Sequence, residues 1–153
     1  MKSLQETHAP GSRCFGCGPA NPRGLRIQSH VVGDEVIAHW TPEPHHEAFE
    51  NILNGGIIGV ILDCHANWTA AWHLMDLRGD SEPPSTVTAD FHIRLRRPTP
   101  TDRELLLRAR VAESADPKVR IAGSLEVDGV VTATVEGLFM AVTEGHPAFH
   151  RWD

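Results

Sequence analysis

The segment Asn54-Gly55-Gly56-Ile57-Ile58-Gly59-Val60-Ile61-Leu62-Asp63-Cys64 places one carboxylate inside an otherwise apolar run. The apolar pattern continues as far as Leu74 without a proline, so it is too long for a single strand. It predicts a buried helix over residues 55–74. Asn54 is a favourable N-cap for this helix, because its side-chain oxygen can accept hydrogen bonds from the first free backbone N–H groups.

Gly55 and Gly56 follow the cap and leave the first backbone N–H groups open to a group that approaches from outside. Such a helix start attracts negative charge. If it faces a carbonyl under nucleophilic attack, the same donors form an oxyanion hole, which typically lowers a barrier by about 3 kcal/mol. The alternative interpretation is a capped helix whose glycines allow close packing.

Asp63 favours the functional interpretation. Burying an unpaired carboxylate costs several kcal/mol or raises its pKa, and such groups collect at active sites. The alternative is an Asp bonded to a neighbouring hydroxyl or backbone group. Gly56 and Asp63 are seven positions apart, or roughly 10 Å along a helix at ~1.5 Å per residue. Asp63 should therefore not reach a ligand at its own helix start, and one shared site requires a second chain in a two-fold dimer.

The composition of the chain excludes several other classes of protein. With 153 residues, 41% of them hydrophobic, the chain suits one domain over residues 1–153. A formal charge of −6 and a pI near 5.9 argue against a nucleic-acid partner. Asp63, His65 and Asn67 interrupt the only candidate membrane span, and the N-terminus does not resemble a signal peptide. We expect a soluble, cytoplasmic protein.

The three cysteines do not indicate a disulfide framework, because an odd number cannot all pair and Cys64 lies in the predicted helix. Cys14-Phe15-Gly16-Cys17 is half of a zinc pattern. The sequence has no second pair of cysteines, so His8 or another His would have to complete a tetrahedral site. We expect no metal and no cofactor.

The remaining segments predict strands. Alternating residues on either side of Gly33-Asp34 predict a hairpin, and Asp128-Gly129 predicts a second tight turn. An irregular segment over residues 1–23 and a surface tail over 143–153 should flank the sheet. The strand-like ranges are 25–31, 36–40, 86–97, 104–113, 118–127 and 130–142. The fold class is therefore α+β, an antiparallel sheet wrapped around one long central helix.

One of these strands carries several candidate residues. Period-two alternation in residues 86–97 predicts one core face and one wet face. The expected core residues are Ala89, Phe91, Ile93 and Leu95. The expected wet residues are Asp90, His92, Arg94 and Arg96.

Several landmarks in this order resemble the hotdog-fold acyl-CoA thioesterases, in particular the phenylacetyl-CoA thioesterase-like branch. Cys14-Phe15-Gly16-Cys17-Gly18, with Asn21-Pro22 and Gly24-Leu25 after it, resembles an N-terminal signature of one subgroup. Asn54-Gly55-Gly56, with Asp63 nine residues after the Asn, resembles the His-Gly-Gly segment and catalytic acid of the family. The resemblance covers roughly residues 14–142 and implies a hotdog fold and a homodimer or homotetramer.

The resemblance also implies roles for individual residues. Asp63 would act on an acyl-CoA thioester as general base or nucleophile from the opposite subunit. The amide of Gly55, with or without that of Gly56, would hold the thioester oxygen. Thr88 matches a Ser or Thr that helps to place water or the acid, although an ordinary strand threonine is an equal alternative.

Asn54 departs from the family, in which many members have histidine at this position. An amide can donate a hydrogen bond to a carbonyl, but it cannot exchange a proton near neutral pH. A non-catalytic acyl-CoA-binding protein is therefore the second hypothesis. A hotdog hydratase ranks last, because Asn21-Pro22 is followed by Arg23-Gly24 where those enzymes carry a His.

Residues that would hold the substrate follow from the same resemblance. Arg94, Arg96 and Arg97 could bind the phosphates of coenzyme A, or they could be solvated residues of a sheet face. The acyl pocket would be lined by the helix and by the loop before it. The candidates for this lining are Phe49, Ile52, Leu53, Trp68 and Trp72, of which the two tryptophans also suit a plain core.

Overall fold

The computed structural model describes all 153 residues. The regular elements are, in chain order, α1 (Leu4–His8), β1 (His30–Val32), β2 (Glu35–Trp40), the 3-10 helix η1 (Pro44–His46), β3 (Glu47–Phe49), β4 (Ile52–Leu53), α2 (Gly55–Arg78), β5 (Thr86–Leu95), β6 (Leu105–Ala115), β7 (Lys118–Val127) and β8 (Val130–Ala141).

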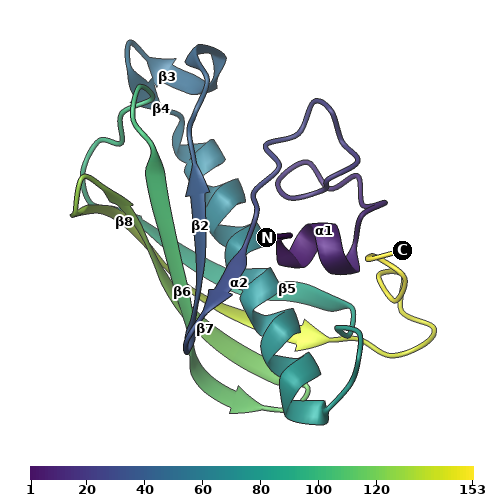
Figure 1. Ribbon diagram of the computed structural model, residues 1–153. Helices are drawn as coiled ribbons and strands as arrows, with labels where there is room; N and C mark the ends of the chain where they lie inside the picture. The colour runs from purple at the N-terminus through teal and green to yellow at the C-terminus, as the bar shows by residue number, and fades with distance from the viewer.

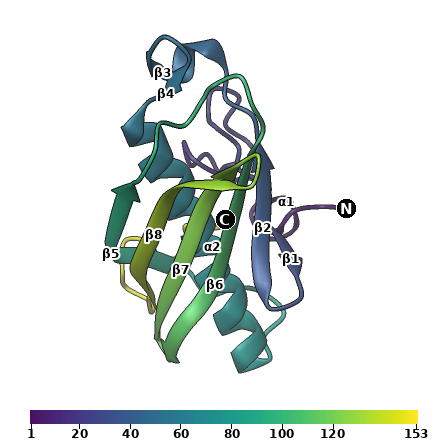
Figure 2. The ribbon, with the colours of Figure 1, turned by 90° about the vertical axis from the view of Figure 1, so that its left-hand side faces the viewer.

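Six of the strands form one antiparallel sheet in the order β1-β2-β6-β7-β8-β5. Figure 2 shows these strands side by side, with α2 behind them. β3 and β4 form a separate hairpin near the start of α2 (Figure 1). One long helix against one antiparallel sheet confirms the predicted α+β arrangement.

α2 is long because nothing interrupts it between its two caps. It begins after Asn54 and ends at Gly79, whose φ of 68° is left-handed and whose N–H bonds to the carbonyls of Met75 and Asp76. The helix therefore extends four residues beyond the predicted end at Leu74. No helix of the structure is both long and apolar enough to cross a membrane, and a cytoplasmic location stays a prediction.

The core lies between α2 and the inner face of the sheet. A larger group of buried side chains joins α2 to the N-terminal segment and to the sheet. A smaller group joins Ala66, Ala70 and Leu74 of α2 to β6, β7 and β8. Trp68 is fully buried, and its ring lies 4.3 Å from that of Trp152. The C-terminal tail thus packs back onto α2 through Trp152.

Three of the four residues of β5 that were predicted to face the core are exposed instead. A bulge between Thr88 and Asp90 shifts the alternation, so that Ala89 is exposed and Thr88 points toward α2. Phe91 and Leu95 are 46% and 58% exposed, because β5 is the edge strand and nothing in this chain covers its outer half. Of the four, only Ile93 packs against the core.

The N-terminal half also departs from the prediction. Residues 1–23 contain α1, which Ser3 and Glu6 stabilise through a reciprocal capping box. The predicted strand at residues 25–31 is reduced to β1. The backbone N–H groups of Leu25 and Ile27 bond instead to carbonyls of the preceding loop, those of Phe15 and Gly16.

Candidate active site

The start of α2 offers fewer free donors than the glycines suggested. Asn54 Oδ1 accepts hydrogen bonds from the N–H of Gly56 at 2.8 Å and from that of Ile57 at 3.3 Å. The N–H of Gly56 is therefore already used by the cap. The N–H of Gly55 has no partner in the chain. Because Oδ1 faces the helix, the Nδ2 donor of Asn54 points away from it.

An apolar groove of about 330 Å³ borders this helix start. It brings Gly55 together with five of the residues predicted to bind the substrate, namely Phe49, Ile52, Leu53, Arg96 and Arg97. The remaining lining residues are Ala48, Ile58, Leu95, Pro98 and Thr99. The groove lining thus combines six hydrophobic residues with two cations, Arg96 and Arg97.

Two of the predicted lining residues do not reach this groove. Trp68 belongs to the core, and Trp72 is not among the groove residues. Both lie more than two turns after Gly55, since a helix rises about 1.5 Å per residue. Trp68 therefore fits the plain-core alternative, and neither tryptophan lines the groove at the helix start.

Asp63 is half-buried on the third turn of α2. The hydroxyl of Thr88 on β5 donates a hydrogen bond to Asp63 Oδ1 at 2.7 Å. Burial raises the pKa of Asp63, whereas the Thr88 hydrogen bond and the nearby Arg151 cation oppose this shift. The carboxylate is therefore oriented through one oxygen, while its other oxygen has no partner in the chain.

The Gly55 amide and the Asp63 carboxylate do not meet within one chain. They are eight positions apart on one helix, or about 12 Å at ~1.5 Å per residue. The structure therefore agrees with the distance argument made from the sequence. A single site that uses both groups requires a second copy of the chain.

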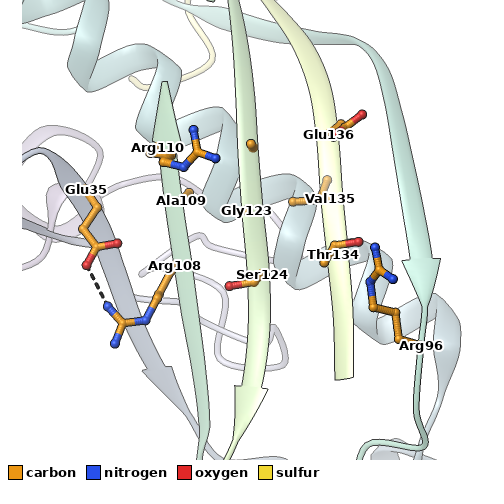
Figure 3. A pocket seen from close by; sticks show the side chains of 11 residues that line it. Glu35, Arg96, Arg108, Ala109, Arg110, Gly123, Ser124, Thr134, Val135 and Glu136 are labelled. Carbon is orange, nitrogen blue, oxygen red and sulfur yellow. Dashed lines mark hydrogen bonds and ion pairs between the residues drawn. The ribbon is translucent and has the colours of Figure 1, made fainter. Parts of the chain in front are cut away.

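Arg94 lies apart from the groove. It shares a hollow on the outer face of the sheet with His92, Arg96, Thr134 and Glu136. Figure 3 shows the adjoining hollow of about 320 Å³ on this face, in which Arg108 pairs with Glu35 at 2.7 Å. Its lining is mostly polar, so this face does not resemble a pocket for an acyl chain. Arg96 borders both the groove and this hollow.

Neither a protein-family model nor a protein of curated function matches this sequence. Solved structures do match it. A thioesterase superfamily protein from Shewanella loihica PV-4 is 26% identical, with a TM-score of 0.67 over 82% of this chain and 98% of that one. A second thioesterase superfamily protein is 22% identical, with a TM-score of 0.72 over 92% of this chain and 69% of that one.

A third match is the E. coli PaaI protein from the phenylacetic acid degradation operon. It is 13% identical, with a TM-score of 0.65 over 78% of this chain and 81% of that one. The chain has the hotdog fold of the thioesterase superfamily. Within that hotdog fold, α2 is the central helix. The groove borders the start of α2 at Gly55 and Ile58, and Asp63 lies on its third turn.

The sequence did not predict that two further residues lie near Asp63 or near the groove. Arg151 stands near enough to Asp63 to lower its pKa, and it donates to the Thr86 carbonyl at 2.7 Å. Leu95 lies at the groove, where a Cβ added to Gly55 would come within 3.1 Å of Leu95 Cδ1. Nothing in the local pattern places Arg151 here, because the tail returns to α2 only in the folded chain.

Proposed function

We propose that this protein hydrolyses an acyl-CoA or a related thioester to a free acid and a thiol. The observation that carries this proposal is the half-buried Asp63 carboxylate, oriented by Thr88 and with one oxygen free, in a hotdog thioesterase fold. A carboxylate in this setting can accept a proton from water or attack a carbonyl itself.

The reaction consumes one water molecule. In the general-base route, Asp63 takes a proton from water, whose oxygen attacks the thioester carbon. In the nucleophilic route, Asp63 forms a mixed anhydride that water then cleaves. In both routes the C–S bond breaks and the leaving thiolate takes up a proton. The free Gly55 N–H stabilises the oxyanion, a contribution of about 3 kcal/mol per donor, and the Nδ2 group of Asn54 can donate a further hydrogen bond.

The groove supports a substrate with an apolar acyl part and an anionic part. Phe49 and Leu53 offer apolar surface at the helix start, and Arg96 and Arg97 offer cations next to it. Guanidinium groups bind phosphates through paired N–H donors, which suits the phosphates of coenzyme A. We assign the phosphate contacts to Arg96 and Arg97 and leave Arg94 to the outer face of the sheet.

The site is shared between two copies of the chain in this proposal. β5 is an edge strand of ten residues that pairs with β8 on one side only and exposes Phe91 and Leu95. Long apolar edges of this kind are covered in native proteins. Pairing of two β5 strands around a two-fold axis would cover them and would bring the Thr88-bound carboxylate of one copy toward the helix start of the other.

Thiol release from a panel of short-chain, long-chain and aryl acyl-CoA esters tests the function. We expect turnover of at least one class of ester by the wild-type protein. The matched measurement is binding of a non-hydrolysable thioether analogue of the same ester by calorimetry. Saturable binding without any thiol release across the panel would contradict the hydrolase.

That second outcome would select the other candidate, an acyl-CoA-binding protein without turnover. Asn54 favours this candidate, because its Oδ1 is engaged by the helix cap and its amide cannot exchange a proton near neutral pH. The groove and its two arginines would serve both functions. Turnover by the Asp63 carboxylate is what separates them.

Phe91→Asp tests the shared site. Removing one buried Phe typically costs about 2 kcal/mol, and a two-fold interface contains the residue twice. We therefore expect the dissociation constant of the dimer to rise by at least about 100-fold, as measured by analytical ultracentrifugation, and turnover to fall with the fraction of dimer. Val130→Asp alters another exposed apolar residue, 47% exposed at a hairpin tip, and should leave both properties unchanged. A fully dimeric Phe91→Asp variant would refute pairing through β5.

A further inference from the structure

Three cysteine sulfurs meet where the N-terminal segment packs on α2. Cys14 and Cys17 lie in the loop after α1, and Cys64 lies in α2 next to Asp63. The three Sγ atoms are all within 4.8 Å of one another, and those of Cys14 and Cys64 are 3.8 Å apart. All three thiols are free. Figure 1 shows this N-terminal segment running beside the helix.

The spacing of the sulfurs fits a shared metal ion. A disulfide holds its sulfurs about 2.05 Å apart, far closer than the 3.8 Å between Cys14 and Cys64. Zinc binds thiolates at about 2.3 Å, and two corners of a tetrahedron of that radius are about 3.8 Å apart. Cys14 and Cys64 thus already stand at the separation that zinc imposes on two of its ligands, and the Cys17 sulfur lies within 4.8 Å of both.

The loop that carries two of the cysteines is shaped to hold them there. A Cβ on Gly16 would come within 2.3 Å of Cys64 Sγ, and a Cβ on Gly18 would come within 2.4 Å of Cys14 N. Glycine at both positions therefore allows the loop to close onto the helix. Hydrogen bonds from Gly18 N to the Cys14 carbonyl and from Ile27 N to the Gly16 carbonyl fix the closed loop.

A buried polar group in the same core as Cys17 also lacks a partner. The indole N–H of Trp68 is buried and makes no hydrogen bond within the chain.

We propose that Cys14, Cys17 and Cys64 bind one zinc ion as three thiolates, with a ligand from solvent in the fourth position. Cys14 is half-buried, so solvent can reach the cluster from its side. Histidine does not complete the set: His8 pairs with Glu82 at 3.0 Å, and both ring nitrogens of His65 are engaged elsewhere. The ion would fasten the N-terminal loop to α2 directly beside Asp63, which replaces our expectation that the chain binds no metal.

Metal analysis of the protein, purified and kept reduced, tests the site. We expect one zinc per chain by mass spectrometry after stoichiometric zinc is supplied and the excess removed. Cobalt in its place should give the charge-transfer bands of thiolate ligands and the visible bands of a tetrahedral ion. Chelation of the metal should lower the melting temperature, since binding stabilises only the folded state.

Three variants separate this site from adventitious binding. Cys64→Ser and Cys14→Ser should each weaken zinc affinity by at least about tenfold and change the cobalt spectrum, because a hydroxyl is a poor zinc ligand. His45→Ala alters the other group of potential ligands, Glu43, His45 and His46, which is largely exposed, and should keep one zinc per chain. Failure of the reduced wild-type protein to bind zinc, or full zinc binding by a folded Cys64→Ser variant, would overturn the proposal.

Discussion

Asp63→Asn should lower kcat for thiol release by about 1,000-fold, which is within the range of 10² to 10⁴ for the loss of a general base. Asparagine has the same shape as aspartate, and its amide oxygen can still accept the 2.7 Å hydrogen bond from Thr88. The fold and the position of the side chain should therefore persist. The loss would be confined to the ability to take a proton or attack the thioester, so KM should change little.

Variants of Thr88 are the matched controls for this experiment. Thr88→Val removes the donor that orients Asp63, and a hydrogen bond to a charged group is typically worth about 1.5–3 kcal/mol. We expect an intermediate loss of turnover of about 10- to 100-fold. Thr88→Ser keeps the hydroxyl and should keep most of the activity. Undiminished turnover by Asp63→Asn would show that Asp63 takes no part in the chemistry. Another carboxylate, at a different site of the protein, would then have to hydrolyse the ester.

The helix and its two chemical landmarks could be predicted because they depend on local physics. Asn54 caps the helix as predicted, and the spacing from Gly56 to Asp63 separates the two groups whatever the rest of the chain does. The core face of β5 could not be predicted. Its bulge arises from the register with β8, and this register turns Thr88 toward Asp63.

The meeting of the three cysteine sulfurs could not be predicted from the sequence either. Cys14 and Cys17 are close in sequence, and their short spacing was visible as half of a zinc pattern. Cys64 is 47 residues beyond Cys17, and only the packing of the loop on α2 brings the three sulfurs together. Contacts between residues so far apart are set by tertiary packing. The periodicity of a single sequence predicts local elements and not these long-range contacts.

His65→Ala should lower the free energy of unfolding by about 3 kcal/mol, and the melting temperature of a domain of this size by about 6–12 °C. His65 is fully buried, with Nε2 2.9 Å from the Val36 carbonyl and Nδ1 2.8 Å from Ser29 Oγ. A carbonyl only accepts, so Nε2 carries the proton and Nδ1 accepts from Ser29. Ser29 in turn accepts from Gln5 Nε2 at 2.9 Å, which ties α1, α2 and β2 together. Alanine would leave a cavity and would remove the His65 partner of the Val36 carbonyl and of the Ser29 hydroxyl.

The same variant tests whether His65 takes the role of the histidine that many family members carry at the position of Asn54. It lies two residues from Asp63, which suggests a catalytic partner, but both of its ring nitrogens are occupied and burial lowers its pKa to about 4. It is therefore neutral and cannot reach a substrate.

Urea unfolding of the His65→Ala variant should show the loss of stability. Its kcat/KM, measured at urea concentrations well below the unfolding transition, should stay within about twofold of wild type. His73→Ala is the control on the same helix, since its one hydrogen bond, to Ser114, is exposed, and it should cost under about 1 kcal/mol. A His65→Ala variant that keeps its stability and loses turnover would place His65 in the chemistry and would contradict this assignment.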